Sequence, residues 1–439
     1  MTATGNLTWV GSIQQNGVVG AGGAGFPSYA KLKTPVEYVL LNGAECEPLL
    51  HKDKELMKRF PDEIVEGLKR VRDHLGASEV VLGVKHKYHD VIELLEARCD
   101  DKMRVYHLPD AYPAGDEFVL VYEGTGRVIP PGGLPLHVGC VVMNVETILN
   151  IVHDKPVTTK YLTVAGAVND PKTVEVPIGV SIREVIEACG GASVEPYAVL
   201  TGGAMMGKLP ASLDEPITKT TGGLLVFPTD HSLIHKYQRT ETAIKVIGKS
   251  ACDQCSFCTE LCPRYLLGHP IEPHKAMRAL GFSHEKLSLI GGSMFCCECN
   301  ICSLIACPED LDPKNVCVMN KVELRAESYK YPEDAPKRDV HGMREGRQTP
   351  ISRLIQKLGL SEFTNKGPLT EIPLNPKFVT IPLRQHIGAP AQAAVKRGDR
   401  VRVGDVIGSI EDGQLGCPVH ASMDGVVREV NETQIIIDA

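Results

Sequence analysis

The spacing of the cysteines constrains this chain more than any other feature. Eight of its fifteen cysteines form two similar runs. The first run is Cys252-x2-Cys255-x2-Cys258-x3-Cys262, followed by Pro263; the second is Cys296-x2-Cys299-x2-Cys302-x4-Cys307, followed by Pro308. Three thiolates at two-residue intervals can wrap one corner of a metal cluster, while the cysteine before the proline reaches a neighbouring cluster. The pattern therefore predicts two clusters that lie close together.

This spacing is typical of bacterial ferredoxins, in which the fourth cysteine of each run binds the other 4Fe–4S cluster. We therefore expect two 4Fe–4S clusters with crossed ligand sets. The first set is Cys252, Cys255, Cys258 and Cys307, and the second set is Cys296, Cys299, Cys302 and Cys262. Zinc also binds C-x2-C pairs, but it has no use for a third cysteine and a Cys-Pro, repeated twice.

Other potential ligands lie in and near the two runs. Cys297 competes with Cys296 as a ligand, and the regular spacing favours Cys296. His269, His274 and His284 are possible ligands in principle, but eight well-spaced cysteines already suffice for two clusters. We expect Cys317 to belong to the hydrophobic core.

Composition limits the possible partners and location. The net charge of −7 indicates neither a nucleic acid nor an anionic membrane as a partner. The cysteine pattern favours a reducing, intracellular setting. The first nine residues lack the features of a signal peptide, and no apolar run reaches the roughly 18 residues of a membrane span. We expect a cytoplasmic protein without a membrane span.

A glycine-rich segment lies near the N-terminus. Gly20, Gly22 and Gly25 satisfy G-x-G-x-x-G, but only Val18 and Val19 precede them, so no convincing strand leads into the segment. Such a loop can cradle a phosphate or lie under a flat ring, because its backbone allows close approach. A mobile glycine loop without a ligand is the alternative.

Residues 36–108 have the pattern of alternating strands and helices. Strands are expected at 36–41, 79–84 and 103–108, and helices at 53–75, broken at Pro61, and at 91–97. Asn42, Glu45 and Glu47 directly follow the first of these strands. Ligands of α/β sheets bind at such strand ends, although a solvated loop would also carry these residues.

Four motifs occur in a specific order along this part of the chain. They are Gly20-Ala-Gly-Gly-Ala-Gly-Phe-Pro27, Asn42-Gly-Ala-Glu-Cys-Glu-Pro48, Tyr112-Pro-Ala-Gly-Asp-Glu117 and Asn144-Val-Glu-Thr147. This order resembles the flavin-binding subunit of respiratory complex I and, more closely, the RnfC family, in which these segments surround FMN and NADH. One departure is Ala44, where complex I has an aspartate.

The resemblance implies a set of cofactor-binding residues. Gly20, Gly22, Gly23, Gly25 and Lys31 would hold the phosphate side of FMN. Asn42, Asn144 and Thr147 would contact the flavin, and Phe26, Glu47 and Glu117 would face NADH. The acidic pair Glu45 and Glu47, with no nearby arginine, favours NADH over NADPH.

The remaining sequence predicts a multidomain α/β protein. We expect an FMN/NADH-binding α/β domain at 1–155, a β-grasp domain similar to SLBB domains at 156–228, a ferredoxin-like two-cluster helical domain at 229–325, a linker at 326–375 and a barrel-sandwich hybrid at 376–439. Residues 202–207 form either a ligand loop or a tight turn packed on the first domain. The turn Met423-Asp424-Gly425 lacks the lysine that lipoyl or biotinyl attachment would need.

The arrangement with a C-terminal barrel-sandwich module is most similar to the cobalamin reductase (PduS) family of propanediol-utilisation microcompartments. It implies an NADH-dependent flavin and iron–sulfur reductase acting on cobalamin, with an adenosyltransferase and a shell protein as partners inside a microcompartment. A general electron-transfer hub linking NADH with a ferredoxin or a shell-bound cluster is the alternative enzyme, and a non-catalytic interaction protein is a third hypothesis. We nominate no side chain as a general acid or base, because the cofactors perform the reaction.

Overall fold

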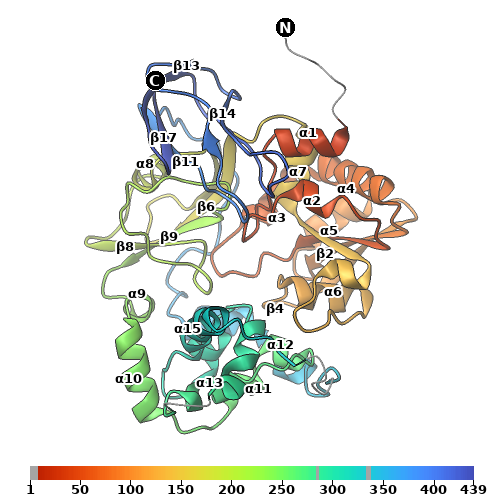
Figure 1. Ribbon diagram of the computed structural model, residues 1–439, viewed down its shortest axis with the longest axis vertical. Coiled ribbons are helices and arrows are strands. Elements are labelled where there is room, and N and C mark those ends of the chain that lie inside the picture. Colours follow the sequence, from red (N-terminus) through yellow and green to blue (C-terminus); the bar gives the residue numbers. More distant parts are fainter. Residues whose placement is uncertain (1–7, 283–285, 333–337) are drawn as a thin grey trace.

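The computed structural model describes residues 8–282, 286–332 and 338–439 (Figure 1). His284 and part of the predicted linker lie outside these residues. No helix in the described ranges is both long and apolar enough to cross a membrane.

The first domain is built on a parallel sheet with the strand order β3-β2-β1-β5. Its strands are β1 (Tyr38–Gly43), β2 (Glu79–Lys85), β3 (Met103–Leu108) and β5 (Cys140–Asn144). Successive side chains of β1 enter different cores, Val39 and Leu41 on one face and Leu40 on the other, as alternation along a strand requires. Both faces of the sheet are therefore covered, which confirms the predicted α/β class.

Helices form both covering layers of this sheet. They are α1 (Trp9–Gln15), α2 (Ser28–Lys31), α3 (Lys52–Arg59), α4 (Pro61–Leu75), α5 (His89–Glu96), α6 (Glu117–Thr125) and α7 (Val145–His153). The helical segment predicted from residue 53 does break at Pro61, which occupies the first position of α4, where its missing N–H costs nothing.

The next domain is a mixed sheet with one helix. Its order is β7-β6-β9-β8, from β6 (Thr159–Gly166), β7 (Lys172–Pro177), β8 (Tyr197–Thr201) and β9 (Gly223–Pro228). Helix α8 (Ile182–Ala188) begins with the predicted capping box, in which Ser181 and Glu184 satisfy each other's backbone amides. This is the arrangement expected of a β-grasp domain.

The cysteine-rich part is helical and lies at the opposite end of the molecule from α1 and from the C-terminal residues of the chain (Figure 1). Its helices are α9 (Ser232–Tyr237), α10 (Glu241–Ala251), α11 (Phe257–Glu260), α12 (Pro263–Leu266), α13 (Pro273–Ala279), α14 (Leu287–Ile290) and α15 (Pro313–Ala326).

Part of the predicted linker is built into the fold. Strand β10 (Thr349–Pro350) pairs with β4 (Ala111–Tyr112) of the first domain. Helix α16 (Ile351–Lys357) then buries Ile351 and Leu354 in a core shared with the β-grasp sheet.

The C-terminal module contains two small sheets around its own apolar core. One has the order β11-β17-β16-β13 and the other the order β12-β14-β15. The strands are β11 (Phe378–Pro382), β12 (Gln392–Ala393), β13 (Arg400–Val401), β14 (Val406–Ser409), β15 (Val419–His420), β16 (Gly425–Val430) and β17 (Gln434–Asp438). The module returns to the side of α1, near the start of the chain (Figure 1).

Candidate functional site

The glycine-rich segment forms a turn against the N-terminus of α7. The amide of Gly20 donates to the Phe26 carbonyl (2.9 Å), and the amide of Ala21 donates to Oγ1 of Thr147 (3.0 Å). A Cβ at Gly22 would lie 2.8 Å from Nδ2 of Asn144. Glycine at position 22 is therefore needed for the loop to approach Asn144 this closely.

The tip of this loop has the features of an anion site. Gly22 and Gly23 are exposed, and their amides have no hydrogen-bond partner among the described residues. Free amides of this kind bind phosphate well. Lys31, on α2, donates to the Val142 carbonyl (3.0 Å) and lies 3.4 Å from Oε1 of Glu117. The loop fits the phosphate end of a nucleotide.

Polar side chains at the strand ends continue the site. Asn144 donates to Oδ2 of Asp53 (2.8 Å), and the Asp53 amide donates to Glu45. Burial and the neighbouring Asp53 raise the pKa of Glu45 to about 7. Oδ1 of Asp53 is buried and forms an ion pair with Nζ of Lys52 at 3.0 Å.

A buried ionic group that the sequence analysis missed supports the loop from below. Glu146 forms ion pairs with Lys52 (2.9 Å) and with Lys160, and Lys160 also donates to the Ala21 carbonyl (3.2 Å). Burial alone would raise the pKa of Glu146, but Lys160 and Lys52 lower it below its usual value. Glu146 lies within the Asn144–Thr147 motif, whereas nothing in the sequence singles out Lys160, which comes from the β-grasp domain.

Two of the predicted residues contact other parts of the chain. Asn42 donates to the Gly115 carbonyl (2.8 Å). The Glu47 carboxylate accepts hydrogen bonds from the amides of Met205 (2.8 Å) and Met206 (2.9 Å) in the β-grasp domain. Residues 202–207 are thus a turn packed on the first domain. Burial raises the pKa of Glu47 to about 7, although these hydrogen bonds act in the opposite direction.

The predicted residues therefore fall into three groups. Gly20, Gly22, Gly23, Gly25, Phe26, Asn144 and Thr147 lie in or against the glycine loop, and Glu45 joins them through Asp53. Lys31 and Glu117 form a pair. Asn42 and Glu47 reach toward residues 115 and 205–206.

The first cysteine set lines one cavity. A cavity of about 350 Å³, open to solvent, is lined by Cys252, Cys255, Cys258 and Cys307, together with His274, several apolar residues and the polar residues Asp253, Gln254, Ser256 and Glu309. Cys307 comes from the second run, so the structure brings the crossed set together. Burial and the neighbouring thiols of Cys252, Cys307 and Cys255 raise the pKa of Cys258 to about 12. The cavity and its four sulfur donors fit a cuboidal cluster.

The second cysteine set is more deeply buried. Cys262, Cys299 and Cys302 are each 7% exposed. Burial and the nearby thiols of Cys296 and Cys262 raise the pKa of Cys302 well above its usual value. The neighbouring Cys297 thiol and burial raise the pKa of Cys299 well above its usual value. Both Cys296 and Cys297 therefore lie at this set, and four or five close sulfur donors fit a second cluster.

A π-helical turn accommodates the irregular spacing of the second run. Residues Cys302–Ala306 form this turn, which takes up the additional residue before Cys307. Cys307 then has φ −76° and ψ 117°, close to φ −69° and ψ 119° at Cys262. The two Cys-Pro cysteines thus leave their runs with the same backbone conformation.

The other candidate ligands have different surroundings. Nδ1 of His274 lies 2.7 Å from Oγ1 of Thr259. His269 is buried beside Phe118, with a ring separation of 5.2 Å. Cys317 lies in the core, as predicted. Within the described ranges, no three His, Cys, Asp or Glu side chains are arranged to hold a single metal ion.

The second cysteine set adjoins the first domain. The Tyr112 hydroxyl donates to the Cys299 carbonyl (2.9 Å), and Asn300 donates to the Met205 carbonyl (3.1 Å). Arg264, two residues after Cys262, forms a largely buried ion pair with Asp116 (2.9 Å). The loop that binds Glu47 and the loop that carries Cys299 are therefore directly linked.

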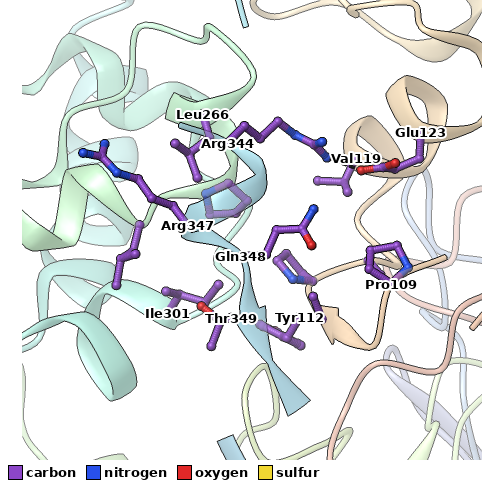
Figure 2. Close-up of a pocket in the computed structure, with 15 residues that line it drawn as sticks. Pro109, Tyr112, Val119, Glu123, Leu266, Ile301, Arg344, Arg347, Gln348 and Thr349 are labelled. Atoms are coloured by element: carbon purple, nitrogen blue, oxygen red, sulfur yellow. Dashed lines mark hydrogen bonds and ion pairs between the residues drawn. The ribbon is translucent and has the colours of Figure 1, made fainter. Parts of the chain in front are cut away.

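A cavity of about 460 Å³ lies beside this contact (Figure 2). Val119 and Glu123 line it from α6, and Leu266 and Ile301 line it from the cysteine-rich domain. Arg344 extends toward Glu123 from the segment that leads into β10, and the two form an ion pair at 2.5 Å. Residues 344–349 thus hold the two domains together.

Comparisons with protein families agree with this architecture. Residues 13–153 match the Nuo51 FMN-binding domain, residues 161–209 the SLBB domain, residues 251–312 the 4Fe-4S dicluster domain, and residues 355–438 the RnfC barrel sandwich hybrid domain. The dicluster match confirms iron–sulfur clusters over zinc for the two cysteine runs.

A full-length relative decides the family. The chain is 44% identical over 431 residues to the cobalamin reductase PduS of Salmonella typhimurium (strain LT2), which covers 97% of this chain and 95% of the relative. The chain belongs to this family. The cobalamin reductase PduS of Citrobacter freundii is 43% identical over 430 residues, with the same coverage. A component of the Na(+)-translocating ferredoxin:NAD(+) oxidoreductase complex of Acetobacterium woodii is 39% identical over 261 residues, 57% of this chain and 56% of the relative.

Membership in the PduS family confirms the predicted resemblance. The protein is an oxidoreductase that combines an FMN-binding domain with two 4Fe–4S clusters. The protein is therefore a flavin and iron–sulfur reductase.

Proposed function

We propose that this protein transfers electrons from NADH, through FMN and two 4Fe–4S clusters, to cob(III)alamin or cob(II)alamin, so that the coenzyme can be regenerated. The observation that carries the proposal is the direct linkage between the flavin-type domain and the buried cysteine set. Tyr112 binds the Cys299 carbonyl, and residue 205 contacts both Glu47 and Asn300. When bound, FMN would accept a hydride from NADH and release its electrons singly.

The glycine loop is the proposed phosphate site of FMN. Gly20, Gly22, Gly23 and Gly25 provide close backbone approach, and Lys31 would add a positive charge near the phosphate. Asn42, Asn144 and Thr147 would contact the flavin. The exposed amides at Gly22 and Gly23 support this assignment.

NADH is the proposed electron donor. Phe26, Glu47 and Glu117 would face the nucleotide, and the carboxylates of Glu45 and Glu47 would disfavour an additional 2′-phosphate. The Acetobacterium woodii relative belongs to a ferredoxin:NAD(+) oxidoreductase complex, which supports the same choice.

The cysteine sets define the proposed electron route. Cys262, Cys296, Cys299 and Cys302 would hold the cluster nearer the flavin, because this set is buried against the first domain. Cys252, Cys255, Cys258 and Cys307 would hold the outer cluster, because Cys255 is exposed and the cavity of this set is bounded by exposed residues. Electrons would leave from this outer side.

Cobalamin is the proposed acceptor because both full-length relatives carry the name cobalamin reductase. An adenosyltransferase would then use the reduced cobalamin, and a shell protein would place the enzyme inside a cytoplasmic microcompartment. A ferredoxin is the competing acceptor, since it appears in the name of the Acetobacterium woodii relative.

The test is an anaerobic spectrum of the reconstituted protein with NADH and hydroxocobalamin as the only acceptor. We expect the flavin absorbance to bleach and reduced cobalamin to accumulate over many turnovers. Bleaching without cobalamin reduction, followed by reduction of added ferredoxin, would favour the electron hub. No bleaching at all would overturn both functions.

A pair of glycine variants locates the flavin in the same assay. Gly22→Val would clash with Asn144, whereas Gly342→Val adds a side chain where no atom lies within 4 Å of the Cβ position. We expect only the first variant to lose flavin and NADH oxidation. Full flavin content in Gly22→Val would reject the glycine loop as the flavin site.

A further inference from the structure

The C-terminal module has a fold that in carrier proteins presents a modified lysine, yet its Met423-Asp424-Gly425 turn has none. The module therefore cannot carry a lysine-linked cofactor at this turn. Its core is separate from that of the first domain, apart from Cys417, which is buried in the core under the parallel sheet. This residue marks the face by which the module contacts the rest of the protein.

That face lies on the segment that leads into the glycine loop. Gln14 donates from Nε2 to the Gly416 carbonyl (3.3 Å), and Sγ of Cys417 lies 3.7 Å from the Val18 carbonyl as a weak donor. Residues 416–418 therefore lie alongside residues 14–18 in space, although about 400 positions separate them in the sequence.

Lys219 connects the two segments. Its ammonium group is buried and donates to the carbonyls of Gly17 (2.7 Å) and Pro418 (3.3 Å). No carboxylate forms an ion pair with it within the described ranges, and both acceptors of its ammonium are backbone carbonyls. Burying an ammonium group without a carboxylate partner costs free energy of folding. This cost suggests that the position of Lys219 has a role. This position joins the β-grasp domain, the start of the glycine loop and the C-terminal module.

A second contact fixes the other end of the loop. A Cβ at Gly25 would lie 3.1 Å from the His386 Cα and 3.2 Å from the Gln385 carbonyl oxygen, and the φ of Gly25 is +71°. Gln385 also accepts a hydrogen bond from the Lys219 amide (3.1 Å). The module thus contacts the loop on both sides of its tip, while Gly22 and Gly23 remain exposed.

We propose that the C-terminal module is a clamp that holds the glycine loop in its phosphate-binding conformation, with Lys219 as the central positioning residue. The clamp rests on the proposed function, because it assumes that FMN binds at this loop. Its physical basis is preorganisation: a loop with both ends fixed loses less conformational freedom when it binds a ligand. The chemical class of the ligand is a flavin mononucleotide held by its phosphate.

The test uses the full chain with its clusters in place, stripped of flavin and titrated with FMN while flavin fluorescence is measured. Lys219→Met retains the side-chain stem but removes the donors. The matched control is Lys396→Met, which removes the same charge from an exposed position of the module. We expect Lys219→Met to weaken FMN affinity at least tenfold and to release FMN faster, whereas Lys396→Met should equal the wild type.

A second variant keeps the proposal testable if Lys219→Met does not fold. Gln385→Ala removes the acceptor for the Lys219 amide, and we expect a smaller but measurable loss of FMN affinity with full iron content. Wild-type affinity in either folded variant would overturn the clamp. If Gly22→Val binds FMN like the wild type, the proposed flavin site itself is wrong. If only Gly22→Val loses FMN, the site stands and the clamp fails.

Discussion

The two cysteine sets arise from nearly the same sequence pattern but have different surroundings. In the outer set (Cys252, Cys255, Cys258 and Cys307) Cys255 is exposed, and a side-chain amide, Nε2 of Gln254, donates to Sγ of Cys252 (3.0 Å). In the inner set (Cys262, Cys296, Cys299 and Cys302) three thiols are 7% exposed, and Sγ of Cys296 accepts from the Glu298 amide (3.3 Å).

The inner set is also held by helix α15. Lys321 donates to the Cys296 carbonyl (2.6 Å) and pairs with Glu298 (2.7 Å). One turn earlier on the same helix, the neighbouring Cys317 thiol lowers the pKa of Cys296 to about 7, against the effect of burial. This contrast indicates that neighbouring elements, more than ligand spacing, decide which cluster faces the flavin and which faces the solvent.

The largest expected effect comes from deleting a ligand of the inner set. Cys299→Ala should remove the inner cluster and reduce cobalamin reduction by NADH to background, because no intermediate site would remain near Tyr112. Flavin bleaching by NADH should persist. The measurement is iron content together with anaerobic stopped-flow absorbance. Cobalamin reduction at the wild-type rate would show that electrons bypass the inner set.

Breaking the contact between the inner set and the first domain should cost stability. Arg264→Ala leaves Asp116 buried without its partner, which typically costs about 3–5 kcal/mol. Arg183→Ala breaks an exposed pair with Asp214 and should cost far less, because water screens that pair. Urea unfolding followed by circular dichroism measures both. Equal losses of stability in the two variants would contradict the importance of the buried Arg264–Asp116 contact.

Iron removal should distinguish the two sets kinetically. Because Cys255 is exposed, an anaerobic chelator should remove one cluster in a fast phase and the other in a slow phase. Cys255→Ala should abolish the fast phase and leave the slow one. Iron release is measured by the absorbance of the chelate. A single phase in the wild type would mean that the sets are equally accessible.

The smallest effect concerns the reduction potential. A hydrogen bond from the Cys317 thiol to Cys296 would stabilise the more negative, reduced cluster. Cys317→Ala should therefore lower the potential of the inner cluster by about 40 mV, the equivalent of about 1 kcal/mol for one electron. Cys317→Ser should restore most of this shift. Redox titration followed by EPR tests this; equal potentials in all three proteins would exclude a tuning role for Cys317.

Local features were predictable from the sequence because local chemistry determines them. The break before α4 follows from Pro61, and the start of α8 follows from the Ser181–Glu184 capping box. The cysteine runs are equally local, since a cluster requires closely spaced thiolates. Their crossed grouping could be expected because short runs ending in Cys-Pro leave one ligand directed outward.

The features that could not be predicted depend on contacts between distant residues. Lys160 reaches the glycine loop from another domain, and β10 pairs with β4 after more than 230 intervening residues. Neither contact can be predicted from the neighbouring sequence. A lysine at the start of a strand usually faces solvent, and so does a polar segment near prolines. The contact of residues 416–418 with residues 14–18 is also determined only by the tertiary packing of separate domains.

The most direct test of the inner-to-outer electron route is freeze-quench EPR of Cys255→Ala with NADH and hydroxocobalamin under anaerobic conditions. We expect the inner cluster to be reduced by NADH at the wild-type rate while reduced cobalamin fails to accumulate. Cobalamin reduction at the wild-type rate by this variant, with the outer cluster absent, would contradict an exit through the outer set.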